Sequence, residues 1–111
     1  MTLTHETIGD VVVIEPLLSR LDAESGEDFR ADVESHLQPD AKIVLDLHCV
    51  DFVDSAGLGT LLSLLKKLVA TGGDLKLCEL TPRARSVFER ARMPQILEIH
   101  PTRVEAVGSY A

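Results

Sequence analysis

The segment from Lys42 to Val69 most constrains what this chain can fold into, because it joins two apolar patterns of different period. Ile43–Leu47 is a nearly continuous apolar run, which is typical of a strand covered on both faces of a sheet. Leucines then recur three and four residues apart, which predicts a helix over Leu58–Val69 that Gly72-Gly73 ends. A strand and helix of these two kinds in succession favour a parallel α/β sheet.

The rest of the chain continues the alternation of strands and helices. Further elements are predicted in this order: strands over 2–8 and 11–14 joined by a turn at Gly9-Asp10, a helix that Asp22 caps, a strand over 75–78, a helix from Thr81-Pro82, a strand over 96–99 and a helix from Pro101-Thr102. The order β-β-α-β-α-β-α-β-α predicts one α/β domain over residues 1–111, with a mixed, mostly parallel sheet of about five strands and about four helices.

Side-chain spacing also predicts which helix faces are buried. The apolar stripe of the Leu58–Val69 helix is expected to comprise Leu58, Leu61, Leu62, Leu65, Leu68 and Val69. Leu64 lies at the edge of that stripe, where it either packs against the core or contacts a partner. In the last helix, Val104 and Val107 are the expected anchors, and Thr102 with Glu105 matches the spacing of a capping box.

Charge and composition exclude several classes of function. The formal net charge of −7 repels phosphate backbones, so no direct binding of nucleic acid is expected. The apolar runs are too short to cross a bilayer and the first residues do not resemble a signal peptide, so we expect a cytoplasmic protein with no membrane insertion. Cys49 and Cys78 lack metal-ligand or redox spacing, and no metal or cofactor is expected.

Asp54-Ser55-Ala56-Gly57-Leu58-Gly59 stands where the central strand leads into the leucine-rich helix. Ser55 has three possible roles there: a helix cap, a nucleophile or a phosphorylated switch. As a cap, its hydroxyl would accept a free backbone N–H of the first turn. Gly57 and Gly59 each cost helix stability, which a cap alone does not require, and they favour close approach of another molecule.

A catalytic role for Ser55 has little support in the sequence. The surrounding residues do not match the Gly-x-Ser-x-Gly pattern of serine hydrolases. A general base would have to be one of the four histidines, His5, His36, His48 or His100. No third member of a triad is evident, so no catalytic residue is predicted and the chain is not expected to be an enzyme.

A phosphate on Ser55 is physically tolerable, because the free N–H groups and the dipole at a helix N-terminus favour an anion. The modification adds about −1.5 to −2 charges. We therefore expect it to leave the domain folded and to change the surface that a partner meets beside Asp54.

Ile43–Leu47 and Val50–Gly59 together resemble the signature of the STAS domain, and the chain is most similar to single-domain bacterial anti-sigma factor antagonists. The resemblance extends over nearly the whole chain. Three further segments carry it: Arg20-Leu21-Asp22, Gly72–Leu77 and Leu80-Thr81-Pro82.

The resemblance implies partner switching. The unphosphorylated protein would bind an anti-sigma factor that is also a serine kinase of the GHKL type, which frees a sigma factor. Phosphorylation at Ser55 would end the binding, and a serine phosphatase would restore it. The implied partner-binding residues are Asp22, Asp54, Ala56, Gly57 and Leu58.

Two further points follow from this family. Many members have a second Ser or Thr where this chain has Ala56, so Ser55 is left as the one clear phosphoacceptor of the motif.

An alternative function is that of a STAS subunit of a bacterial lipid-transport ABC complex, docking on its ATPase. The Asp54–Gly57 motif favours the switch, but such subunits can carry similar motifs.

Overall fold

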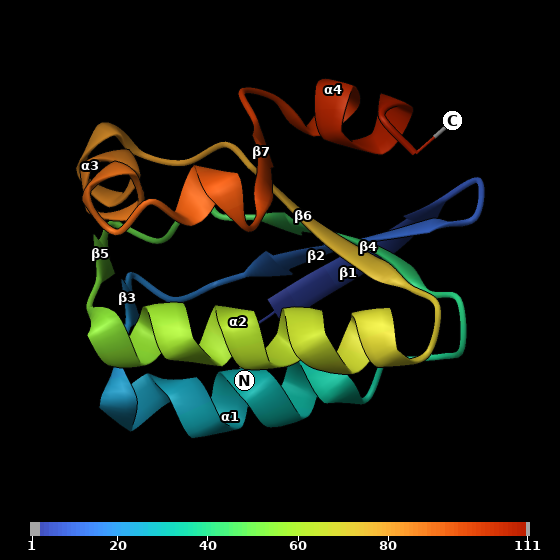
Figure 1. Cartoon of the computed structure of the whole chain (residues 1–111), viewed down its shortest axis with the longest axis horizontal. Coiled ribbons are helices and arrows are strands. Elements are labelled where there is room, and N and C mark those ends of the chain that lie inside the picture. The colour runs from blue at the N-terminus through green and yellow to red at the C-terminus, as the bar shows by residue number, and fades with distance from the viewer. Residues whose placement is uncertain (1–2, 111) are drawn as a thin grey trace.

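The computed structural model describes residues 3–110, which are arranged around a five-stranded sheet of order β1-β2-β4-β6-β7 (Figure 1). The strands are β1 (Leu3–Ile8), β2 (Val11–Pro16), β3 (Arg20–Leu21), β4 (Lys42–Asp46), β5 (Phe52–Val53), β6 (Asp74–Cys78) and β7 (Glu98–His100). The helices are α1 (Ala23–Glu34), α2 (Ser55–Ala70), α3 (Pro82–Arg90) and α4 (Arg103–Gly108), with a short 3-10 helix η1 (Met93–Gln95).

The pairing of the strands confirms the predicted α/β class. β1 pairs antiparallel with β2, while β2, β4, β6 and β7 pair parallel in that order. The sheet is therefore mixed and mostly parallel, as the alternation of strands and helices implied. Thr2, which the predicted first strand included, lies outside the described residues.

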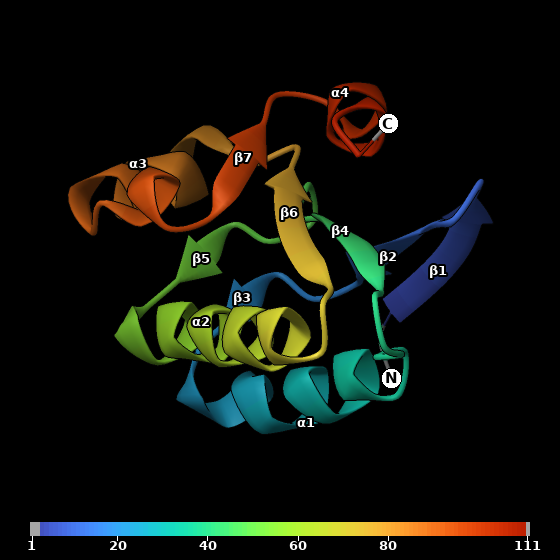
Figure 2. The same ribbon diagram turned by 45° about the vertical axis from the view of Figure 1, so that its right-hand side comes forward.

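Side chains on the two faces of the sheet feed two apolar clusters. Ile43 and Leu45 of β4 point into the larger cluster, between the sheet and helices α1 and α2. Val44 points into the smaller cluster, between the sheet and α4. Figure 2 shows α1 and α2 below the sheet and α4 above it. Because both faces are covered, β4 can be apolar nearly throughout, which is the pattern read from the sequence.

The predicted stripe of α2 is wrong in its last turn. Val69 is 57% exposed, and Leu64 is fully buried, so Leu64 belongs to the core. The buried line runs through Gly57, Leu61, Leu64 and Leu68. The helix packs against both the sheet and α1, so leucines on more than one side find apolar neighbours, and a leucine-rich pattern does not define the centre of the buried face.

The predicted anchors of α4 are also partly wrong. Val104 is 80% exposed, whereas the neighbouring turn buries Ala106 and packs Val107 and Tyr110 against the smaller cluster. Tyr110 adds a hydrogen bond from its hydroxyl to the Ile43 carbonyl at 2.8 Å. A helix of six residues offers too few turns for a periodic pattern to fix its orientation.

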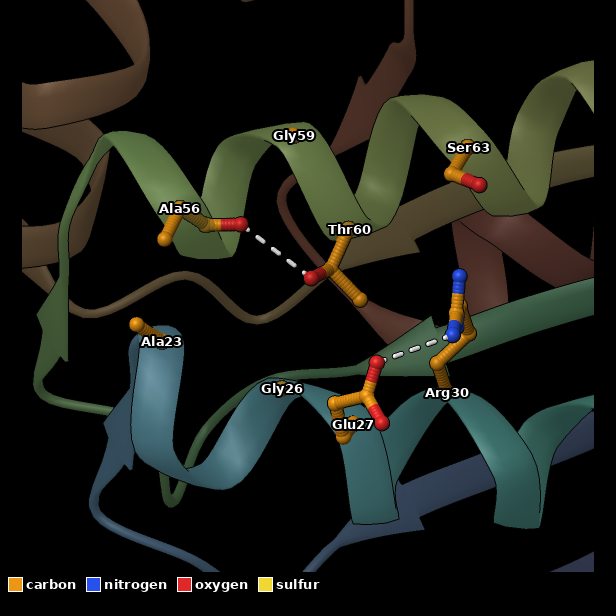
Figure 3. A pocket seen from close by; sticks show the side chains of 8 residues that line it. All are labelled: Ala23, Gly26, Glu27, Arg30, Ala56, Gly59, Thr60 and Ser63. Atoms are coloured by element: carbon orange, nitrogen blue, oxygen red, sulfur yellow. Dashed lines mark hydrogen bonds and ion pairs between the residues drawn. The ribbon is translucent and has the colours of Figure 1, made fainter.

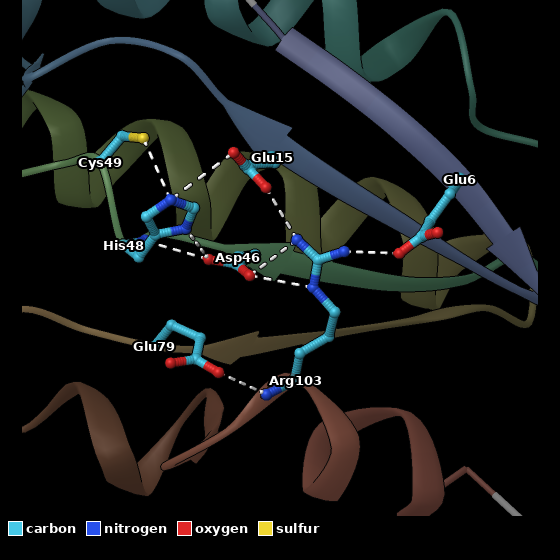
Figure 4. Close-up of polar contacts among 7 residues, drawn as sticks. All are labelled: Glu6, Glu15, Asp46, His48, Cys49, Glu79 and Arg103. Atoms are coloured by element: carbon cyan, nitrogen blue, oxygen red, sulfur yellow. Dashed lines mark hydrogen bonds and ion pairs between the residues drawn. The ribbon is translucent and has the colours of Figure 1, made fainter.

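Polar contacts at the carboxyl ends of the strands fasten α4 to the sheet (Figure 4). The Arg103 guanidinium donates from Nε and Nη2 to the Asp46 carboxylate at 3.0 and 2.8 Å, and from Nη2 to Glu15 at 2.8 Å. Burial alone would raise the pKa of Asp46, but hydrogen bonds from His48 and Arg103 outweigh it and hold the pKa below its usual value. Asp46 thus stays ionised although its side chain is only 5% exposed.

Replacing Arg103 with methionine should lower the free energy of unfolding by about 2–4 kcal/mol, because the buried Asp46 carboxylate loses its cationic partner. Arg83→Met is the matched control, since Arg83 pairs with Asp51 at an exposed site and its loss should cost less than about 1 kcal/mol. Urea denaturation measures both values. Equal losses in the two variants would contradict a special role for Arg103.

Candidate functional site

The motif that begins at Asp54 is positioned by a pair of very short strands. β3 and β5 run parallel, with Arg20 opposite Phe52 and Leu21 opposite Val53. The Ser19 carbonyl also accepts the N–H groups of Asp51 and Phe52, at 2.8 and 3.0 Å. Strands of two residues have no measurable periodicity, so the sequence did not indicate this pair. Its effect is to bring the starts of α1 and α2 to one corner of the molecule (Figure 1).

Each strand of the pair is followed by an aspartate that caps a helix. The Asp22 carboxylate accepts the Ser25 N–H at 3.0 Å, and the Ser25 hydroxyl completes a capping box, so the predicted cap of α1 is confirmed. The Asp54 carboxylate accepts the Gly57 N–H at 2.9 Å in the same way. The helix cap of α2 is therefore Asp54, and the hypothesis that Ser55 caps the helix is wrong. A carboxylate is the stronger acceptor at this position.

Ser55 is the first residue of α2 and is exposed. Its hydroxyl makes no hydrogen bond to any of residues 3–110. The Asp54 carboxylate takes the N–H of Gly57, while those of Ser55 and Ala56 belong to the first turn, where a helix offers no internal acceptor. The hydroxyl is thus presented to solvent beside free backbone donors.

Gly57 has a reason inside the molecule to lack a side chain. A Cβ atom at this position would overlap the backbone carbonyl oxygen of Leu21 in β3. Gly57 is buried, so its small size permits the close approach of α2 to β3 rather than that of another molecule. A Cβ on the exposed Gly59, by contrast, would meet no atom within 4 Å.

A groove of about 310 Å³ runs between the first halves of α1 and α2 (Figure 3). Small residues make it possible: Gly26 of α1 faces Thr60 of α2, and a Cβ on Gly26 would lie 2.9 Å from the Thr60 hydroxyl oxygen. The groove is lined by Ala23, Gly26, Glu27, Arg30, Ala56, Gly59, Thr60 and Ser63. Because Ala56 lines the groove, the groove begins at the residue that follows Ser55.

The charges around this corner are mostly negative. Hydrogen bonding from the Ser25 backbone N–H holds the pKa of Asp22 below its usual value. Arg20 supplies the nearest cation, with its Nε 3.3 Å from Asp22 Oδ2 and its guanidinium 4.3 Å from the centre of the Phe52 ring. The corner thus offers two aspartates, one stacked arginine and two helix N-termini.

The structure brings the predicted site residues together. Asp22 and Asp54 follow a paired set of strands, Ser55 and Ala56 are exposed beside them, and Leu58 is half-buried in the same turn. Sequence reasoning missed the groove, whose α1 side comes from Gly26, Glu27 and Arg30. Gly26, a glycine inside a predicted helix, was the available signal, because such a glycine often marks close helix packing.

The histidine that lies nearest to Ser55 in sequence is engaged elsewhere. His48 Nδ1 lies 2.8 Å from Asp46 Oδ1, and its Nε2 lies 3.4 Å from the Cys49 sulfur. No hydrogen bond joins any histidine to Ser55 within residues 3–110. Ser55 therefore has no histidine among residues 3–110 that is hydrogen-bonded to it in the way that activates a nucleophile.

Gly57→Ala and Gly59→Ala should change stability in opposite directions. The first variant should lose about 1–3 kcal/mol of unfolding free energy, because its methyl group meets the Leu21 carbonyl. The second should gain about 0.5–1 kcal/mol, since alanine fits an open helical position. Thermal or urea unfolding distinguishes them, and an unchanged or raised stability of Gly57→Ala would refute the assignment of Gly57 to internal packing.

A curated relative matches the chain over almost its whole length. BtrV of Bordetella bronchiseptica, which carries the name of an anti-sigma factor antagonist, is 32% identical over 111 residues, covering 99% of this chain and 95% of BtrV.

Solved structures share the fold. A protein of Thermotoga maritima superposes with a TM-score of 0.85 at 24% identity, covering 96% of this chain and 92% of that one. The anti-sigma factor antagonist SpoIIAA in its unphosphorylated form has a TM-score of 0.75 at 25% identity, covering 97% and 95%. SpoIIAA of Bacillus in its phosphorylated form has a TM-score of 0.68 at 26% identity, covering 98% and 99%.

A family comparison agrees with both sets of matches. The model of the STAS domain matches residues 3–106, from the first strand of the sheet to the last helix. Among residues 3–110, no helix has the length and apolar content that crossing a bilayer requires. The strand order, the paired helix starts and the family match lead to one conclusion: this chain belongs to the STAS domain family.

Proposed function

We propose that this chain is an anti-sigma factor antagonist of the bacterial cytoplasm, and thus a regulatory binding protein rather than an enzyme. Its proposed partner is an anti-sigma factor that is also a serine kinase of the GHKL type. The unphosphorylated chain binds this partner and frees a sigma factor. Phosphate on Ser55, added by the kinase and removed by a separate serine phosphatase, ends the binding. The names of BtrV and SpoIIAA support the first part, and the two forms of SpoIIAA support the second.

The observation that carries this proposal is the position of Ser55. The side chain is exposed at the first position of a helix of 16 residues, and its hydroxyl is not engaged by any of residues 3–110. A kinase can therefore reach the hydroxyl without unfolding the helix. Thr60 and Ser63, which lie deeper in α2, are only partly exposed, and the Thr60 hydroxyl already donates to the Ala56 carbonyl at 3.1 Å.

The proposed contact surface surrounds Ser55 at the starts of α1 and α2. Asp22, Asp54, Ala56 and Leu58 form it, and the buried Gly57 acts beneath it by letting the first turn of α2 lie against β3. The groove between α1 and α2 begins at Ala56 and can receive a side chain of the partner. Small residues along this groove leave room for an inserted group.

A phosphate would change this surface by charge and bulk. The dianion can accept the N–H groups of the first turn, so the helix tolerates it. The same dianion stands beside the Asp54 carboxylate, and Asp22 lies across the corner, so the local charge becomes strongly negative. A partner that packs against this corner and offers no cations at the contact would bind more weakly, because the phosphate overlaps it sterically and would have to be desolvated.

Affinity for the host's anti-sigma kinase tests the proposal. Wild-type protein and Ser55→Ala should bind alike, whereas Ser55→Asp should bind about 100-fold more weakly, because like charges or an unpaired charge in an interface cost several kcal/mol. Ser86→Asp is the matched control. Ser86 is exposed on α3, so an aspartate there adds the same charge outside the proposed surface. Binding by calorimetry measures all four proteins.

Two outcomes would contradict the proposal. Equal loss of affinity in Ser55→Asp and Ser86→Asp would mean that net charge and not the corner decides binding. Capture of an ABC-transporter ATPase instead of an anti-sigma kinase from the native host would favour the transport function. Intact-mass and fragment analysis after incubation with the kinase and ATP should also place a single phosphate on Ser55, and phosphate on another residue would refute the site.

A further inference from the structure

Three potential metal-binding side chains meet at the carboxyl ends of β2 and β4, outside the proposed partner surface (Figure 4). Glu15 belongs to β2, and His48 and Cys49 follow β4. The His48 Nε2, the Cys49 sulfur and a Glu15 carboxylate oxygen all lie within 4.8 Å of one another. The sequence did not predict this cluster, because Glu15 comes from a different strand and pairing of strands, not spacing along the chain, brings it near.

Neighbouring groups hold two of these side chains in position. His48 Nδ1 lies 2.8 Å from Asp46 Oδ1, so Nε2 is the ring nitrogen that faces the cluster. One Glu15 oxygen accepts Arg103 Nη2 at 2.8 Å, and the other oxygen faces His48. An imidazole held by a carboxylate is the usual outer arrangement of a metal-bound histidine.

Two of the three distances between the donor atoms match those around a tetrahedral metal ion. A Zn²⁺ ion with bonds of about 2.1 Å to nitrogen and oxygen and about 2.3 Å to sulfur sets N and S about 3.6 Å apart and N and O about 3.4 Å apart. The structure has 3.4 Å between His48 Nε2 and the Cys49 sulfur, and 3.6 Å between Nε2 and Glu15 Oε2. The third distance, between the Cys49 sulfur and the Glu15 carboxylate, is within 4.8 Å, and binding of the ion would draw these two groups together.

We propose that Glu15, His48 and Cys49 form a binding site for a divalent transition metal ion of the zinc type, with water in the fourth position. The mixed oxygen, nitrogen and sulfur donors suit zinc, whereas Mg²⁺ and Ca²⁺ take oxygen donors. On binding, Cys49 coordinates as the thiolate and its proton passes to solvent.

Contacts within the cluster are loose for a set of direct hydrogen bonds. The 3.6 Å between His48 Nε2 and Glu15 Oε2 exceeds the length of a direct N–H···O hydrogen bond. The surrounding carboxylates of Asp46 and Glu6 add negative charge, and Arg103 balances only part of it. The cluster therefore favours a cation near its donor atoms.

The full-length chain, stripped with a chelator, should bind one Zn²⁺ per molecule in calorimetry. Co²⁺ should give a sulfur-to-metal charge-transfer band. Cys49→Ser should abolish that band, and both Cys49→Ser and His48→Gln should weaken Zn²⁺ binding at least about tenfold. Cys78 stays in every variant, and burial raises the pKa of its thiol to about 12, so a band lost in Cys49→Ser belongs to Cys49.

His100→Gln is the control for the histidine, because His100 pairs with Glu98 at 2.6 Å and takes no part in the cluster. It should bind Zn²⁺ like the wild type. Far-UV circular dichroism without metal verifies that each variant is folded. Absence of stoichiometric binding, a charge-transfer band that survives in Cys49→Ser, or equal weakening in His100→Gln would overturn the site. This outcome is independent of the proposed switch at Ser55.

Discussion

The contact between Gly57 of α2 and the Leu21 carbonyl of β3 underlies the arrangement of the candidate site. Only a residue without a side chain lets the first turn of α2 approach β3 so closely. The Asp54 N–H donates to the same Leu21 carbonyl at 3.3 Å, which locks β5 beside β3. Because both strands end at this point, both helices start there, and their caps and free N–H groups face the same side.

Sequence reasoning was reliable where one local interaction decides the structure. The cap Asp22 and the helix start at Thr81-Pro82 are confirmed, with Thr81 as the cap and Pro82 in the first turn, because each depends on residues within one turn. The Thr102 cap is confirmed as well, with the Glu105 N–H donating to its hydroxyl at 3.1 Å, although no return bond from the Glu105 side chain completes the predicted box. The strand β4 was equally clear, since an apolar run of that length needs two covered faces.

The remaining features depend on contacts between distant parts of the chain. The β3–β5 pair is too short to show a pattern, and Val69 and Val104 are exposed because the orientation of each helix is set by its neighbours. Two glycines of α2 also show that the sequence alone does not reveal such contacts. Gly57 and Gly59 look alike in the sequence, yet one contacts a backbone carbonyl and the other faces open space. Only the position of β3 separates them.

The segment between β4 and α2 carries two different chemistries at its two ends. Its first part holds His48 and Cys49 beside Asp46, and its last residue, Asp54, caps the helix that begins at Ser55. Backbone hydrogen bonds fix the segment along its length: the N–H groups of Leu47, Val50, Asp51 and Phe52 all donate to protein carbonyls. Val50 and Val53 are also buried in the core. A segment anchored in this way has little freedom to carry a displacement from one end to the other. Under the proposed switch, charge at Ser55 would therefore act on a partner that docks at the corner and would leave the cluster around His48 in place.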